Sequence, residues 1–509
     1  MGQENFNIEL VSNVQFDNDR GNDIWGYVSP DSTEYAIMGT ADFTRIFDLS
    51  TPENPIEIIA IAGNPGSVHR DIKSFEEYVY VTCDQGQDGL LIVDMRMVEE
   101  DSVAFKFWKP EIMGNALSNC HNLYIDEQGY CYLAGCSVSQ GRVLVFDLAD
   151  DPWNPTYLGV VGERYSHDVI VRNNLVYSSE INDGIFSIYD IADLGNVEIL
   201  GTQETTFSFT HNMWISDDGN YAFTTDERQN AFVESYDVSD PSDIFRLDKF
   251  QPHETAGTDV IPHNTHFING YLVTSWNSDG VIITDVTDPE NMVQVGAYDT
   301  YLGPVLLSSG CWGVYPWLPS GLIIASDRTS GLFVLQPNYQ RAARLKGVVT
   351  DLNNNSTING VDVEFNNIAI VNTSTNSTGD YATGTATAGT YEVQFSHPDY
   401  ETLTRQVDLV LGETTTLDVQ LEPLASGVDA VSLNENITVR PNPFISAPKI
   451  SFQGKYEKLQ IYTLTGELIQ SYNLNSNELI LENDFKSGMY IAVLSGKENA
   501  ISVFKLIKT

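Results

Sequence analysis

Residues 143–155 read VLVFDLADDPWNP, an apolar run that ends in aspartate and passes into a turn rich in Asp, Asn and Pro. β-Branched and aromatic residues favour strands, and Pro with Asn or Asp favours tight turns. The same form recurs along residues 1–340, which predicts a repeated β unit. Its strand portions are RIFD (45–48), LIVD (91–94), VLVFD (143–147), FSIYD (186–190), VESYD (233–237) and VIITD (281–285).

A His or Trp opens another β-rich segment upstream of these runs and again after the last one. These markers are Trp25, His69, His121, His167, His211, His263 and Trp312, spaced 44 to 52 residues apart. Such a period fits a four-stranded antiparallel sheet, so seven copies predict an all-β fold with a seven-bladed β-propeller. A long β-sandwich is the alternative, but it does not explain the fixed period. The seventh unit has only three strands, so we expect residues 7–16 to complete it and remove an open sheet edge.

The segments DIWGYVSP (23–30) and EYAIMG (34–39), followed by the LIVD-type repeats, resemble the choice-of-anchor B proteins, which are built from LVIVD repeats. The resemblance covers essentially all of residues 1–340. It implies a propeller that is secreted or displayed on a bacterial surface, and it supplies no assigned reaction.

Composition excludes several classes of partner. The chain has 509 residues, 42% of them hydrophobic, which is enough for several packed domains. Its formal charge of −44 would repel a nucleic-acid backbone or an anionic bilayer, so we expect no nucleic-acid partner. No apolar run approaches the roughly 20 residues that a membrane-spanning helix needs, so no membrane span is expected.

Residues 341–423 are rich in Thr, Asn and Gly and alternate with period two, which is typical of a small β-sandwich. Three segments carry a resemblance to the carboxypeptidase regulatory-like domain, a transthyretin-like sandwich: INGVDVEF (358–365), STGDYATG (377–384) and AGTYEVQFSHPDYE (388–401). The resemblance implies a spacer or adhesive appendage without catalytic residues.

Residues 424–437 form an expected linker, and residues 438–509 follow it. There, VRPNPF (439–444), a strand–turn–strand segment and SGMY (487–490) resemble the type A sorting domain of the type IX secretion system of Bacteroidetes, which has an immunoglobulin-like fold. The resemblance implies contact with the type IX machinery, release or attachment at the cell surface, and a signal peptide already removed ahead of MGQENF. The motif residues are Pro441, Asn442, Pro443, Gly466, Gly488 and Tyr490.

The five cysteines contain no CxxC pair, so they predict neither a zinc ribbon nor a thioredoxin motif. If residues 127–129 form a three-residue turn, Cys120 and Cys136 occupy directly opposed strand positions. Export makes the oxidised form favourable, so we predict a disulfide between them.

The histidines are the main candidates for a binding site at the mouth of the propeller channel. Hairpin numbering with short turns places several His or Trp residues opposite a carboxylate of the next strand. His121 and His263 are instead followed by Asn, and His266 is an additional His outside the pattern. The expected pairs are His69–Asp84, His167–Glu180, His211–Asp226 and Trp312–Asp327.

Two interpretations of this ring stay open. In the first, each His ties a blade to its own second strand, and the neighbouring carboxylate raises the imidazole pKa. Recurrence in several blades favours this structural role. In the second, imidazoles and carboxylates bind a divalent metal, since both are ligands for Zn, Cu or Mn.

Two functions follow from these interpretations. The first is an exported binding or adhesion protein whose ligand is a glycan, a protein or a small molecule. The alternative is a metal-dependent extracellular hydrolase or oxidoreductase acting at the His-lined mouth. The sequence contains no GxSxG, HExxH or Walker motif, so no residue is assigned a catalytic role.

Overall fold

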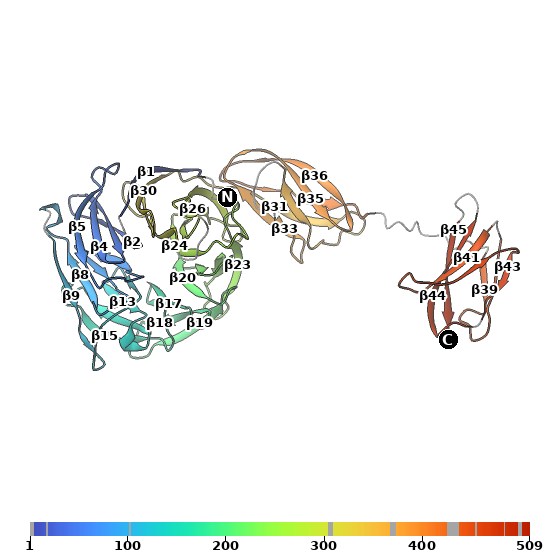
Figure 1. The fold of residues 1–509 in the computed structure, drawn as a ribbon, viewed down its shortest axis with the longest axis horizontal. Helices are drawn as coiled ribbons and strands as arrows, with labels where there is room; N and C mark the ends of the chain where they lie inside the picture. Colours follow the sequence, from blue (N-terminus) through green and yellow to red (C-terminus); the bar gives the residue numbers. More distant parts are fainter. Residues whose placement is uncertain are drawn as a thin grey trace. The chain divides into compact units, whose positions relative to one another are not determined.

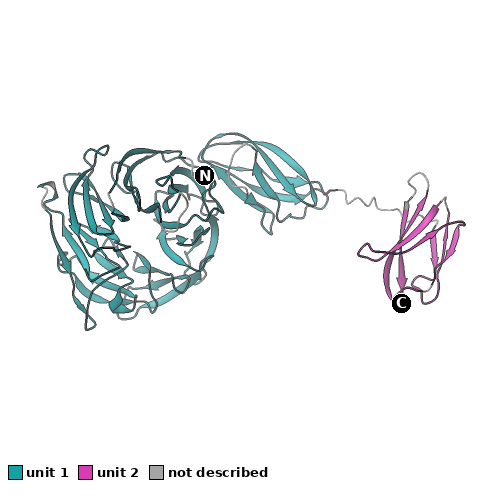
Figure 2. Cartoon of the chain, viewed as in Figure 1, with its two compact units in different colours: residues 1–422 teal, residues 423–509 magenta. Residues whose placement is uncertain are grey.

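A computed structural model describes residues 5–509 except 17–18, 101–102, 304–308, 367–372, 425–436, 454–455, 483 and 497–500. Most of the expected linker therefore lies outside the described residues. The described chain is all-β, with no α-helix and two short 3₁₀ turns, η1 (Val98–Glu100) and η2 (Ser137–Ser139). It divides into two compact units, residues 1–422 and 423–509 (Figure 2).

Residues 8–337 form seven four-stranded antiparallel sheets. In each sheet the strands lie side by side in the same order, from a first strand to a fourth strand. The first strands are β2 (Gly21–Val28), β6 (Ile72–Phe75), β12 (Asn122–Ile125), β16 (Asp168–Arg172), β20 (Thr210–Ile215), β24 (Pro262–Ile268) and β28 (Cys311–Tyr315). The second strands are β3 (Glu34–Thr40), β7 (Tyr78–Val81), β13 (Tyr130–Ala134), β17 (Leu175–Glu180), β21 (Tyr221–Asp226), β25 (Tyr271–Trp276) and β29 (Ile323–Asp327).

The two outer strands of each sheet complete the unit. The third strands are β4 (Phe43–Asp48), β8 (Leu90–Asp94), β14 (Val143–Asp147), β18 (Ile185–Asp190), β22 (Val233–Asp237), β26 (Gly280–Asp285) and β30 (Gly331–Pro337). The fourth strands are β5 (Ile56–Ala62), β9 (Ala104–Trp108), β15 (Thr156–Val161), β19 (Glu198–Glu204), β23 (Phe245–Phe250), β27 (Val293–Tyr298) and β1 (Ile8–Val14). A short hairpin, β10 (Glu111–Ile112) with β11 (Asn115–Ala116), lies between two of the sheets in sequence.

The seven first strands contact one another in a closed cycle. Each one touches the first strand of the next sheet, and β28 of the last sheet touches β2 of the first. Figure 1 shows the sheets arranged around the centre that these strands line. The N-terminal strand β1 pairs antiparallel with β30, so the seventh sheet takes one strand from the start of the chain, as residues 7–16 were expected to provide.

The aspartate that ends each repeated run has a local role. In six third strands its carboxylate accepts a hydrogen bond from the backbone N–H two residues later, as from Ala149 to Asp147 at 2.8 Å. This Asx turn sends the chain out of the strand and explains why Asp recurs there. The six residues are Asp48, Asp94, Asp147, Asp190, Asp237 and Asp285.

A disulfide joins Cys120 and Cys136, the two residues that strand numbering places opposite each other. Cys120 precedes β12 and Cys136 follows β13, so the bond closes the mouth of one hairpin. The other three cysteines, Cys83, Cys131 and Cys311, are free and buried.

Residues 343–421 form a two-sheet sandwich around an apolar core that includes Val363 and Phe395. One sheet has the order β33-β32-β35-β36, and the other has β34-β31-β37, with β38 also paired to β31. The strands are β31 (Ala343–Asp351), β32 (Asp362–Phe365), β33 (Thr373–Ser374), β34 (Asp380–Thr385), β35 (Gly389–His397), β36 (Tyr400–Leu409), β37 (Thr414–Thr416) and β38 (Val419–Leu421).

The sandwich packs on the sixth repeated sheet within the same compact unit. The Asn291 side-chain amide donates to the Thr383 carbonyl at 3.0 Å, and Arg344 of β31 forms a buried ion pair with Asp285 of β26. Gly384 lies so close to Val293 that an added Cβ would come within 2.8 Å of it. The residues expected to act as a spacer are therefore held against the repeats by specific contacts.

The second unit contains two sheets, ordered β39-β40-β43 and β42-β41-β44-β45. Its apolar core includes Phe444, Leu459 and Leu506. The strands are β39 (Ile437–Arg440), β40 (Lys449–Phe452), β41 (Tyr456–Tyr462), β42 (Leu468–Asn473), β43 (Glu478–Ile480), β44 (Gly488–Gly496) and β45 (Ile501–Lys508).

Candidate functional site at the centre of the repeated sheets

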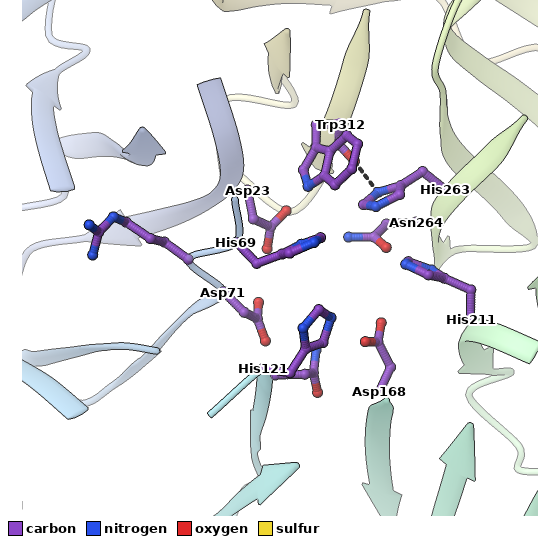
Figure 3. A pocket seen from close by; sticks show the side chains of 11 residues that line it. Asp23, His69, Asp71, His121, Asp168, His211, His263, Asn264 and Trp312 are labelled. Atoms are coloured by element: carbon purple, nitrogen blue, oxygen red, sulfur yellow. Dashed lines mark hydrogen bonds between the residues drawn. The ribbon is translucent and has the colours of Figure 1, made fainter. Parts of the chain in front are cut away.

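Six aromatic side chains at the starts of the first strands form a closed ring, which we call the axial ring. Successive ring centroids are 4.5, 3.9, 4.3, 4.5 and 4.0 Å apart, and the last residue returns to the first at 5.3 Å. The sheet of β2 contributes Asp23 to the same pocket (Figure 3). The members are His69, His121, His167, His211, His263 and Trp312.

β-Bulges at the starts of several first strands alter the pairing of these residues. In β20, Thr210 pairs with Asp226 and Asn212 with Thr225, which leaves His211 between two paired positions. The register of β28 shifts in the same way around Trp312. A bulge sets two residues against one and re-aims the side chain of the extra residue.

Three of the expected side-chain contacts are wrong. Bulges explain the failure at His211 and Trp312, whereas the regular register of β16 continues toward His167 opposite Glu180 without bringing their side chains into contact. Glu180 accepts hydrogen bonds from Tyr189 at 2.7 Å and Ser187 at 2.8 Å rather than from His167. Asp226 accepts from the Thr205 hydroxyl at 2.6 Å and the Phe207 N–H at 2.7 Å, not from His211. Asp327 likewise accepts from the Thr300 hydroxyl and from the Thr329 and Ser330 N–H groups, not from Trp312.

The fourth expected pair, His69–Asp84, is joined by a backbone hydrogen bond, in which the Asp84 N–H donates to the His69 carbonyl at 3.3 Å, and a ring nitrogen of His69 lies within 4.8 Å of a carboxylate oxygen of Asp84. The Asp84 carboxylate lies 3.5 Å from Nδ1 of His121, which belongs to the next sheet. His167 Nδ1 is 2.9 Å from Asp168, its neighbour in sequence. The imidazoles of His121 and His167 therefore lie beside carboxylates other than those that hairpin numbering predicts for them.

Asx residues near the histidines join neighbouring sheets. Asp71 accepts from the Leu123 N–H at 2.7 Å, and Asn122 accepts from the Val169 N–H at 3.1 Å. These bonds link the start of β6 to β12, and β12 to β16, so they fasten neighbouring first strands directly.

The chain of bonds continues at Asn212. Its amide donates to Asp168 at 2.8 Å, and its carbonyl oxygen accepts from the Thr265 N–H at 2.9 Å. Asp71, Asp168 and Asn212 were not among the residues expected from the sequence to form the site. A signal was present, since His is followed directly by Asn or Asp in four of the five His repeats.

Burial decides the charge of most axial-ring histidines. It holds the pKa values of His69 and His211 well below the usual range, lowers that of His167, and lowers that of His263 to about 3. The expectation that neighbouring carboxylates raise the pKa values of His69, His167 and His211 is therefore wrong. Desolvation of an imidazolium outweighs the attraction of the acids.

His121 is the exception within the ring. Burial opposes its protonation, but the hydrogen bond with Asp84 and the charge of Asp168 raise its pKa. Burial alone would raise the pKa of Asp168, yet the hydrogen bond from His167 and the charges of the imidazoles lower it to about 2. Asp168 is therefore ionised at neutral pH.

His266 lies with a group of tryptophans rather than in the axial ring. Its imidazole centroid is 4.7 Å from Trp214, 5.1 Å from Trp317 and 6.2 Å from Trp25. Lys73 lies over the Trp25 ring at 4.4 Å. Trp25 therefore does not occupy the position of the His markers, and Asp23 stands in its place at the pocket.

Among the described residues, three groups of side chains bring possible metal-ligand atoms within 4.8 Å of one another. Imidazole and carboxylate atoms are 3.5 Å apart at His121–Asp84 and 2.9 Å apart at His167–Asp168, and the third group has longer separations of 3.7 and 4.0 Å to Glu227. The groups are His69 with Asp84 and His121, His121 with His167 and Asp168, and His211 with Glu227 and His263.

In the second unit the motif residues fix the chain near its C-terminal strand. Asn442 donates to the Lys505 carbonyl at 2.7 Å and accepts from the Ile507 N–H at 2.8 Å, and Pro441 and Pro443 flank it. Tyr490 donates to the Lys486 carbonyl at 2.9 Å. Gly466, at φ +82°, occupies the turn between β41 and β42, and Gly488 begins β44.

Residues 438–509 match the family model of the secretion system C-terminal sorting domain. Residues 344–422 match that of the carboxypeptidase regulatory-like domain. Among curated proteins, no sequence matches this chain. The type IX sorting domain identifies a protein that is secreted or held at the cell surface and that contacts the secretion machinery. Among the described residues, no helix has the length and apolar character to cross a membrane.

Proposed function

We propose that residues 1–340 form a seven-bladed β-propeller of the LVIVD-repeat, choice-of-anchor B type, and that this propeller is the binding part of an exported adhesion or recognition protein. The observation that carries the proposal is the closed cycle of seven first strands around one polar pocket, with Asx hydrogen bonds joining consecutive sheets from β6 to β24. Ligands of closed β architectures commonly bind where such a cycle opens to solvent.

The remaining residues serve delivery and presentation in this proposal. Residues 341–423 form a regulatory-like sandwich fixed to the propeller, residues 424–437 are a linker, and residues 438–509 are the sorting domain. The separate compactness of residues 423–509 supports a tail that can be removed without unfolding the rest. Deleting residues 438–509 should abolish export and leave the propeller folded, and normal secretion of the shortened chain would contradict this assignment.

The proposed ligand is a polar molecule on the cell exterior, such as a glycan, a peptide or a small metabolite, that contacts the axial pocket. Its lining includes Asp23, Asn264 and five axial-ring residues, His69, His121, His211, His263 and Trp312. We propose no reaction for this site.

A binding screen tests the proposal. The full chain is applied to a glycan array and a metabolite panel, beside His69→Ala in the pocket and His397→Ala in the sandwich. A ligand retained by wild type and His397→Ala but weakened by His69→Ala supports the propeller as the binding part. Binding that only His397→Ala weakens would transfer the function to the sandwich, and turnover of a bound compound would favour an enzyme.

A further inference from the structure

We propose that His211, Glu227 and His263 form a binding site for a divalent first-row transition-metal ion, with Zn²⁺ as the probe. Two imidazole nitrogens and one carboxylate oxygen are a donor set that such ions accept. The proposal goes beyond the binding function above, because the chain alone would hold the ion without any surface ligand.

The orientation of His263 is the first observation. Its Nδ1 lies 2.6 Å from the Trp312 carbonyl oxygen, drawn as a dashed line in Figure 3. A carbonyl can only accept, so Nδ1 carries the proton and Nε2 keeps its lone pair. Ligating histidines in metal sites are typically fixed by this kind of hydrogen bond from the other ring nitrogen. Nε2 is buried and has no hydrogen-bond partner among the residues that the structure describes.

His211 supplies the second unpartnered imidazole. Its side chain is 2% exposed, and within the described part of the chain neither of its ring nitrogens has a hydrogen-bond partner. A buried polar group without a partner costs free energy, so two such imidazoles side by side point to a missing partner. Their ring centroids are 4.5 Å apart, and they come from the adjacent strands β20 and β24.

Glu227, directly after β21, faces both imidazoles. One carboxylate oxygen lies 3.7 Å from His211 Nε2, and the other lies 4.0 Å from His263 Nε2. Ligands about 2.1 Å from a tetrahedral ion are about 3.4 Å apart, so small side-chain rotations would complete the geometry. Both histidines line the axial pocket, which leaves a fourth position open toward it.

The other two candidate groups lack this feature. His121 and His167 already face Asp84 and Asp168 at 3.5 and 2.9 Å, so those carboxylates satisfy them. The unpartnered nitrogens therefore single out the third group.

Calorimetric titration of the chelator-treated full chain with ZnCl₂ at pH 7.5 tests the site. We expect one saturable site per chain, with affinity lowered at least about tenfold in Glu227→Gln and in His263→Ala. The matched control is His397→Ala, which removes an imidazole from the sandwich and should bind Zn²⁺ as wild type does. Absence of saturable binding, or wild-type affinity in Glu227→Gln, would overturn the proposal.

Co²⁺ substitution gives a second readout. A tetrahedral site with two imidazoles should produce visible absorption bands that Glu227→Gln weakens. Because Glu227→Gln preserves side-chain shape, it carries the test even where His263→Ala fails to fold, and a matching circular dichroism spectrum confirms its fold. Neither measurement uses a surface ligand, so failure here leaves the propeller proposal to be judged by its own screen.

Discussion

The guanidinium of Arg344 lies 3.1 Å from the carboxylate of Asp285, and the two side chains are only 5% and 0% exposed. Asp285 ends the sixth repeated run and makes the same Asx turn as its counterparts. It also accepts the Ala342 N–H at 2.7 Å, where the chain enters the sandwich. One residue of the repeat is thus used twice, to turn its own strand and to fasten the following domain.

Arg344→Ala should destabilise the unit of residues 1–422. Removing one partner of a buried ion pair leaves an uncompensated charge, at a cost of about 3–5 kcal/mol. The measurement is urea unfolding of the full chain, followed by tryptophan fluorescence. Arg341→Ala is the matched control, because Arg341 contacts the same carboxylate at 3.4 Å but is 36% exposed. Its cost should stay below about 1 kcal/mol, and equal effects of the two variants would refute the buried pair.

Asn212→Ala should weaken the closure of the strand cycle. The variant loses the bonds to Asp168 and to the Thr265 N–H, and both partners stay buried. We expect a loss of about 1–3 kcal/mol in the free energy of unfolding. Asn220→Ala, at an exposed hairpin turn, provides the comparison and should change stability much less. If Asn212→Ala left the free energy of unfolding unchanged, the Asx bonds would not be what holds the sheets together.

The cysteines should fall into two chemical classes. Native protein treated with an alkylating reagent should gain no adduct, since Cys83, Cys131 and Cys311 are buried. Unfolding without reductant should expose those three thiols, and reduction should then release Cys120 and Cys136. Mass spectrometry counts the adducts at each stage. The double variant Cys120→Ser, Cys136→Ser should lose about 3 kcal/mol of stability, and five adducts before reduction would rule the disulfide out.

Stability should fall on acidification below about pH 6.5. Burial lowers the pKa of His253 and of His266 to about 3, and Lys73 lowers that of His266 further while Asp168 opposes it. Between about pH 3 and pH 6.5 the unfolded chain therefore binds more protons than the native chain. The contribution of these histidines to the free energy of unfolding is fully present above pH 6.5 and is lost as the pH falls toward 3. Each such histidine contributes about 1.4 kcal/mol per pH unit.

Urea unfolding at pH 4, 5, 6 and 7 measures this slope. His266→Phe keeps an apolar ring among the tryptophans and should reduce the slope by about 1.4 kcal/mol per pH unit. His397→Ala serves as the control outside the repeats. An unchanged slope in His266→Phe would mean that His266 is protonated in the native protein.

Local chemistry made several features predictable. The aspartate of VLVFD bonds to a backbone group two residues away, so its role follows from its immediate neighbours. The Cys120–Cys136 pair depends on a single short hairpin, and counting along that hairpin locates it. The Pro-Asn-Pro segment and Gly466 likewise act through turns and short-range strand contacts.

By itself, the sequence determined the all-β class, the period of the repeat, the disulfide pair and the secretion address, because each depends on contacts within one hairpin or on one contiguous motif. Only the tertiary structure decided which carboxylate faces which imidazole. Bulges in the first strands shift the register by one residue, and the partners of His121, His263 and Asp285 come from other sheets or from the sandwich. Contacts of that kind depend on how the sheets close and dock, and no spacing along one strand encodes that geometry.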